Sequence, residues 1–148
     1  MYTLEDAHAV VLGYAQRWRV EDFHKAWKSG VCHVEDNQLR DKQHIVIWAA
    51  VLASVAMRIL RLMYLSRTAP ELPATVELTP SEIEALVLAS RTNKHKPGDT
   101  PTIGEAVLWL AYEGSYTGKS SGGPPGALVI SRGLKGIRVL ARVLADRH

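Results

Sequence analysis

The chain has 148 residues, of which 47% are hydrophobic, so it is long enough to bury a core and too apolar to stay disordered. Its only cysteine, Cys32, excludes an internal disulfide and fits a reducing cytoplasm. The formal net charge of +3 is weak evidence for a polyanionic partner, and we expect no secretory signal because Met1 is not followed by a basic stretch and an apolar segment.

Two helices are predicted in the first 30 residues. The first covers residues 4–16, with Thr3 in the N-cap position. The second carries Glu21 and ends at Gly30, which suits a left-handed C-cap. The sequence leaves open whether the two are continuous; a kink at Trp18–Val20 is the alternative.

The longest predicted helix covers residues 38–66 and is expected to be the centre of the fold. Between residues 45 and 57, Ser54 is the only residue that is not apolar. Such a pattern is typical of a core helix that is apolar nearly all round. This stretch is shorter than the roughly 18–20 residues of a membrane span, so no membrane partner is expected. For Arg58 and Arg61, which follow, an interhelical salt bridge is the first interpretation and phosphate binding the alternative.

Three further helices are predicted after a linker, which makes the fold all-α, with five to six helices around the long central one. Capping-box patterns at Thr79–Glu82 and Thr102–Glu105 begin the next two helices, and Gly114 ends the second of them. The last helix, residues 131–146, has an apolar stripe that packs either on the chain's own core or on a second subunit. The stripe is Leu134, Ile137, Ala141 and Leu144, and the cations on another face are Arg132, Lys135, Arg138 and Arg142.

Spacing disfavours two other kinds of site. A zinc site needs four well-spaced ligands, and Cys32 is not part of a CxxC pair. The loop from Gly114 to Gly126 resembles a phosphate-binding loop, but it has three residues between its first glycines where such a loop has four, and the flanking strand and helix are missing. We therefore expect a surface loop, in which Lys119 approaches DNA at most.

One face of the helix around Glu21 carries an unusual set of side chains. At about 100° per residue, a carboxylate, three cations, a phenol and an indole share this face. The opposite face, with Val20, Phe23 and Trp27, is apolar and expected to be buried. We call the polar set the Glu21 face; it consists of Tyr14, Arg17, Trp18, Glu21, Lys25 and Lys28.

Ordinary solvation explains part of the Glu21 face. The pairs Arg17–Glu21 and Glu21–Lys25 have i,i+4 spacing, which is common on exposed helices and contributes about 0.2–0.5 kcal/mol per pair. A purely solvating face would have no use for the two aromatic side chains, Tyr14 and Trp18.

The spacing Tyr-x2-Arg-x3-Glu-x6-Lys resembles the YREK motif of the insertion-sequence DDE transposases, the IS-four family that includes the Tn-five-type enzymes. Tyr14, Arg17, Glu21 and Lys28 occupy its four positions, and residues 17–30 are similar to the Tn-five-type version in nearly every letter. Four fixed positions in a matching context are far more specific than charge spacing alone. The resemblance extends over essentially the whole chain, which looks like the last third of such a transposase.

The resemblance implies DNA transposition, in which two divalent ions, Mg²⁺ or alternatively Mn²⁺, promote phosphoryl transfer at transposon ends. Glu21 would be the third metal-binding carboxylate beside two aspartates. Residues 1–36 would form the segment of the catalytic Glu, and residues 37–148 a helical dimerisation domain. The transposon end would be bound by Tyr14, Arg17, Trp18, Lys25 and Lys28.

The two aspartates have no counterpart here, because no Asp of this chain follows the buried strand that a ribonuclease H-like sheet would supply. We therefore expect a C-terminal transposase fragment that is inactive alone and contributes end binding, Glu21 and dimerisation. The alternative is a non-enzymatic helical module that dimerises with a full-length transposase or inhibits it. Either would act in the cytoplasm, with DNA and a second copy or a full-length transposase as partners.

Overall fold

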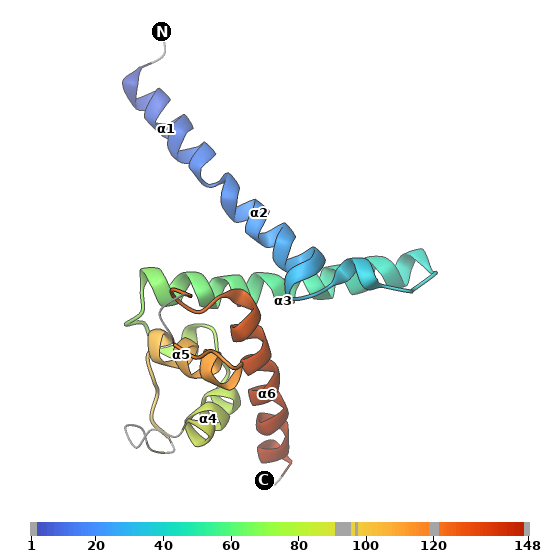
Figure 1. Cartoon of the computed structure of the whole chain (residues 1–148), viewed down its shortest axis with the longest axis vertical. Coiled ribbons are helices and arrows are strands. Elements are labelled where there is room, and N and C mark those ends of the chain that lie inside the picture. Colours follow the sequence, from blue (N-terminus) through green and yellow to red (C-terminus); the bar gives the residue numbers. More distant parts are fainter. Residues whose placement is uncertain (1–2, 91–95, 97, 119–121, 147–148) are drawn as a thin grey trace. The chain divides into compact units, whose positions relative to one another are not determined.

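The computed structural model describes residues 3–90, 96, 98–118 and 122–146 (Figure 1). In these ranges every regular element is a helix, and β-type pairing is limited to an isolated bridge between Pro73 and Thr102. The predicted all-α fold class is confirmed. The chain divides into two compact units, Met1–Ala56 and Met57–His148, whose boundary lies inside the longest helix. The division predicted after residue 36 stays a prediction about the roles of the segments.

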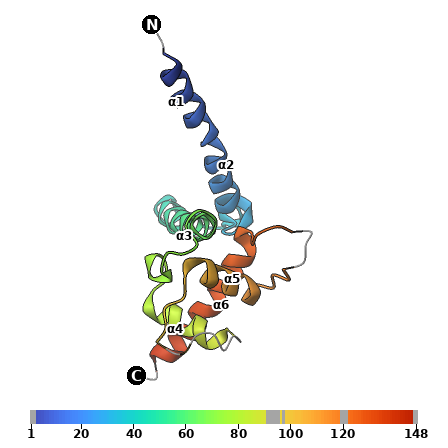
Figure 2. The same ribbon diagram turned by 90° about the vertical axis from the view of Figure 1, so that its left-hand side faces the viewer.

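The first unit begins with α1 (Leu4–Ala15) and α2 (Arg17–Lys25) (Figures 1 and 2). Thr3 forms a capping box with Asp6: the hydroxyl accepts from the Asp6 N–H, and the Asp6 carboxylate accepts from the Thr3 N–H at 2.8 Å. The break between the helices lies at Gln16, just before the position predicted for a kink. Neither helix has a buried residue, so the whole Glu21 face stays accessible.

One π-helical turn, η1 (Ala26–Gly30), continues α2, and a 3₁₀ turn, η2 (Val34–Asp36), follows. The left-handed cap predicted for Gly30 is wrong, since Gly30 is not among the residues of positive φ. Glycine is needed there for another reason: a Cβ would lie 2.9 Å from the carbonyl oxygen of Lys25, inside the widened turn.

Two side chains attach this segment to the first half of α3 (Lys42–Thr68). The indole N–H of Trp27 donates to the Ala49 carbonyl at 3.1 Å, and the Cys32 thiol donates to the Leu52 carbonyl at 3.2 Å. Burial raises the pKa of the Cys32 thiol, so it stays a thiol and serves as a donor. The end of α2 is therefore fixed on a scaffold of its own unit.

The first half of α3 was predicted to be buried in the core, but it is not. Only Ala56, Ile59 and Leu62 of this helix are buried, all in or near its second half. Leu52, Ala53 and Val55 are half-buried, whereas most of the apolar side chains before them are exposed. The exposed set includes Ile45, Val46, Ile47, Trp48 and Val51.

By length and composition, α3 is also the one helix in the described ranges that could cross a membrane. The apolar stretch recognised in the sequence ends before Arg58, whereas the 27-residue helix contains an 18-residue apolar window with at most two charges. A single such helix is weak evidence for a membrane span, since core helices of soluble proteins meet the same criterion.

In the second unit, α6 (Ala127–Ala145) packs on both α5 (Ile103–Glu113) and α4 (Pro80–Ala89) (Figures 1 and 2). Both predicted capping boxes, at Thr79 and Thr102, are present. The apolar stripe of α6 lies on the chain's own core, which decides between the two alternatives. Fully buried core side chains include Ile59, Leu62, Leu86, Ile103, Leu110 and Ile130.

Candidate nucleic-acid interface

The centre of the Glu21 face is a three-residue arrangement across the α1–α2 junction. A guanidinium nitrogen of Arg17 lies 2.9 Å from a carboxylate oxygen of Glu21, and the guanidinium carbon lies 5.3 Å from the centre of the Tyr14 ring. The side chains of Arg17 and Glu21 are 60% and 59% exposed. The phenol, the cation and the carboxylate therefore follow one another along an open surface, where a polyanion can reach them.

Trp18 lies beside this row with its indole half exposed. The guanidinium carbon of Arg19 lies 5.7 Å from the centre of its ring, a cation–π distance. An exposed indole next to cations is suited to stacking on an unpaired base. Arg19 was not predicted as part of the Glu21 face, because its helical position falls outside the sector of that face.

The C-terminal end of the face carries Lys25 and Lys28. Lys25 is exposed and has no ion-pair partner among residues 3–90 or the other described ranges. The Lys28 ammonium, in the π-turn, lies 3.7 Å from a carboxylate oxygen of Glu35 in η2. The predicted cations thus lie on α2 and on the π-turn that continues it, but two of the three are already paired with carboxylates.

The opposite side of α2 is only partly covered. Phe23 and Trp27 are half-buried and stack with ring centres 6.0 Å apart. Val20 is 55% exposed, so its predicted burial is wrong. The helix position was right, but no neighbouring element in the described chain reaches that far along α2.

The residues that the structure describes do not form a two-metal site. Among the described residues no group of three His, Cys, Asp or Glu side chains could hold a metal ion. The partner of Glu21 is a cation, Arg17, and a single carboxylate cannot hold two hard divalent ions. Glu21 can act as a ligand only if other carboxylates are brought to it.

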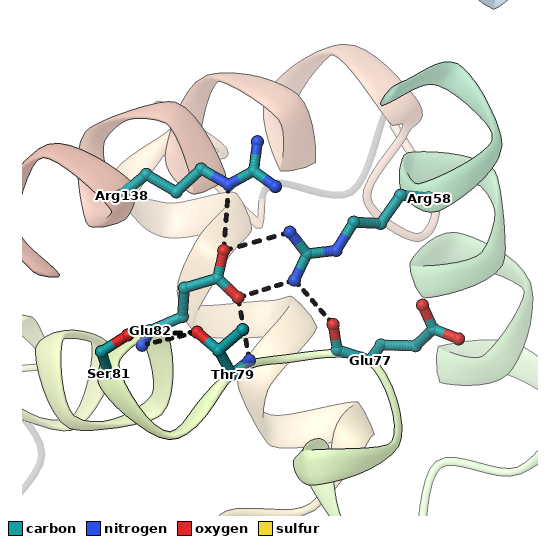
Figure 3. A network of polar contacts seen from close by, with 6 residues as sticks. All are labelled: Arg58, Glu77, Thr79, Ser81, Glu82 and Arg138. Carbon is teal, nitrogen blue, oxygen red and sulfur yellow. Dashed lines mark hydrogen bonds and ion pairs between the residues drawn. The ribbon is translucent and has the colours of Figure 1, made fainter. Parts of the chain in front are cut away.

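A second polar cluster lies in the second unit and joins three helices (Figure 3). Glu82 of α4 accepts from Arg58 of α3 at 3.0 and 2.6 Å and from Arg138 of α6 at 2.9 Å. The Thr79 N–H donates to the same carboxylate at 2.9 Å. The salt-bridge interpretation of Arg58 is confirmed, and Arg61 likewise pairs with Glu77 at 2.6 Å.

Glu82 is charged in this cluster. Burial by itself would raise the pKa of Glu82, but the hydrogen bonds from Arg58, Thr79 and Arg138 outweigh it and hold the pKa at about 2. The side chain is only 7% exposed. A carboxylate that is bound on all sides by its own chain has no capacity left for a ligand, so this cluster is a structural clamp.

Sequence reasoning identified Glu82 as a capping residue but missed its role in the clamp. The available signal was that a cation on α6, Arg138, stands at the edge of the buried stripe. Pairing it with a particular carboxylate requires the order in which α3, α4 and α6 pack, and periodicity does not provide that order.

Comparison with known families matches both units. The Transposase Tn5 dimerisation domain model matches residues 54–146, and the Transposase DDE domain model matches residues 2–58. The two matches meet within α3, where the compact units also divide.

Because the first match covers more than half of the chain, the protein belongs to the Tn5-type DDE transposase family and functions in DNA transposition. The family assignment made from the sequence is confirmed. A DDE domain implies the use of divalent metal ions in a complete enzyme.

Proposed function

We propose that the Glu21 face binds transposon-end DNA and that Glu21 supplies one of three metal-binding carboxylates to a DDE site. The observation that carries the proposal is the alignment of cations and aromatic rings on one exposed side of α2, within the segment matched by the DDE domain. Mg²⁺, or alternatively Mn²⁺, is the ion that such a carboxylate set prefers.

The chemistry of each side chain supports a role in this interface. Arg17 and Lys28 offer charged donors to phosphate oxygens, and the Tyr14 hydroxyl is a further donor. Trp18 provides an apolar ring at the side of the row, where the last base of a duplex end could stack. Glu21 lies between these groups, so in the proposed DNA complex its carboxylate oxygens would be close to the phosphates.

We propose that the chain does not cleave or join DNA by itself. The support is the absence of any three-carboxylate group among the described residues and the pairing of Glu21 with Arg17. The purified chain incubated with transposon-end DNA and Mg²⁺ or Mn²⁺ should give no nicked or joined product. Strand transfer by this chain alone would overturn the proposal.

Salt-dependent DNA binding tests the interface. In fluorescence anisotropy with a labelled blunt-ended duplex over a range of salt concentrations, Arg17→Ala and Lys28→Ala should each weaken binding. Lys96→Ala is the matched control, because Lys96 is an exposed cation of the other unit. Equal effects of all three substitutions would show that only net charge matters, and no effect of any would remove the interface.

We further propose that the chain forms a homodimer through the outer face of α6. This surface includes exposed Val139, Val143 and Gly136, and a Cβ at Gly136 would meet no atom within 4 Å. An apolar strip around an open glycine permits close helix contact. The family's name for residues 54–146 supports dimerisation as the role of this unit.

The second candidate function is a non-enzymatic partner of a full-length transposase. The observation in its favour is that the dimerisation unit has its own buried core and clamp, whereas the DDE segment has no metal-binding group in the described ranges. A mixed dimer would contain one incomplete site. Pull-down with full-length transposase tests this, and failure to co-purify counts against it.

A further inference from the structure

Two cations of the Glu21 face are already paired with carboxylates. Arg17 is paired with Glu21 at 2.9 Å, and Lys28 is paired with Glu35 at 3.7 Å. The second carboxylate does not come from the face itself but from η2, which follows the π-turn and folds back toward Lys28. In the free chain, carboxylates therefore pair with the cations that we expect to contact DNA phosphates.

The net charge of the segment that carries the Glu21 face affects how these ion pairs influence DNA binding. Residues 1–36 contain four Lys and Arg but six Asp and Glu, so the segment that carries the DNA-binding face is net negative. Phosphates that approach the face meet Glu21 and Glu35 next to the cations. DNA affinity is reduced in two ways: a carboxylate must be displaced from its cation, and a phosphate must then be held close to that negatively charged carboxylate.

We propose that Glu21 and Glu35 form an electrostatic mask over Arg17 and Lys28, which keeps the DNA affinity of this chain low until the carboxylates are neutralised. The inference rests on the proposed function, because it regulates the same face. The paired side chains are half or more exposed, so both ion pairs can open without disturbing the core. Exposed pairs are weak, and a phosphate can replace the carboxylate.

An electrostatic mask and a purely structural role predict opposite changes in DNA affinity when Glu21 and Glu35 are removed. If Glu21 and Glu35 only steadied the helix and the turn, their removal would leave DNA binding unchanged or weaken it. If they mask the cations, Glu21→Gln and Glu35→Gln should tighten DNA binding. A freed cation should also add one phosphate contact, which steepens the slope of log Kd against log salt by about 0.9.

The experiment uses the whole chain and a labelled blunt-ended DNA duplex, with anisotropy measured over a range of KCl concentrations. The variants are Glu21→Gln and Glu35→Gln, and the matched control is Glu5→Gln. Glu5 lies in the first turn of α1, in the same unit as the Glu21 face. It is exposed and has no ion-pair partner among the described residues. Its removal changes the charge of the unit by the same amount without freeing a cation.

We expect Glu21→Gln and Glu35→Gln each to lower Kd about three- to tenfold at low salt with the steeper slope, and Glu5→Gln to change Kd less than twofold. The gain from Glu21→Gln should disappear in the Arg17→Ala background, and the gain from Glu35→Gln in the Lys28→Ala background.

Equal tightening by all three glutamine variants would refute the mask, because it would reflect net charge alone. Unchanged binding by Glu21→Gln and Glu35→Gln, together with weaker binding by Arg17→Ala and Lys28→Ala, would refute the mask and leave the interface intact. If the two cation variants also bind like the wild type, the proposed interface fails and the mask fails with it.

Discussion

Gly133 of α6 lies directly against the main-chain carbonyl of Leu110 in α5, so that the two helices touch backbone to backbone. A Cβ at Gly133 would lie 1.8 Å from that carbonyl oxygen. A second glycine, Gly114 at the end of α5, has the reciprocal relationship: its Cβ would lie 1.8 Å from the carbonyl oxygen of Val129 in α6. Two glycines therefore allow α5 and α6 to approach each other through their backbones.

A single methyl group at Gly133 should accordingly force α5 and α6 apart. We expect Gly133→Ala to lower the free energy of unfolding by about 1–3 kcal/mol or more, because the obstacle is backbone and cannot rotate away. Gly13→Ala, in the interior of α1, is the control, since its Cβ would meet open space. It should raise helix stability by up to about 1 kcal/mol. Urea unfolding at equal protein concentration measures both, and similar effects of the two would contradict the contact.

The Glu82 clamp should make the second unit sensitive to acid. The folded pKa of about 2 lies below the unfolded value of 4.5, so the stabilisation is fully present above pH 4.5 and is lost as the pH falls toward 2. The shift corresponds to about 3 kcal/mol. Thermal unfolding followed by circular dichroism between these pH values should show the loss in the wild-type chain and a much flatter profile in Glu82→Gln.

Glu84→Gln is the control for this profile. Glu84 lies on the same helix but is exposed, and no ion pair to it occurs in the part of the chain that the structure describes. It should keep the acid dependence of the wild type. If Glu82→Gln retained the full loss of stability below pH 4.5, another group would be responsible and the clamp would be dispensable.

A charge placed on the outer face of α6 should abolish dimerisation. Val139 is 59% exposed on this face, so Val139→Glu should leave the monomer folded and introduce two carboxylates into the interface of a dimer. Light scattering after size exclusion should give the mass of a monomer. Val76→Glu is the matched control, because Val76 is also exposed in this unit but lies in the 3₁₀ turn η3 (Ala74–Val76). If Val139→Glu remained a dimer while Val76→Glu became a monomer, the dimer interface would not include the outer face of α6.

Local rules predicted much of this structure. The capping boxes at Thr79 and Thr102 are present, because a cap depends on residues three positions apart. The helix that bears Glu21 was also predicted, since helical spacing alone places its side chains on one face. These features require no knowledge of what packs against them.

The errors concern features that depend on neighbours distant in sequence. Gly133 lies within the predicted last helix, but its close contact with Leu110 was not predicted. Val46 and Trp48 were expected in a core but are exposed, because apolar character shows that a residue can be buried and not that a partner is present. Glu35 was outside the predicted site because a 3₁₀ turn brings it to Lys28.

Photo-cross-linking tests whether the exposed side of α2 contacts DNA ends. A photoreactive benzoyl-phenylalanine in place of Trp18 should cross-link to the terminal nucleotides of a transposon-end duplex. The same group in place of Val20, which is similarly exposed (55% against 51%) on the other side of the helix, should give little product. Cross-linking of equal yield from both positions, or none from position 18, would contradict the account.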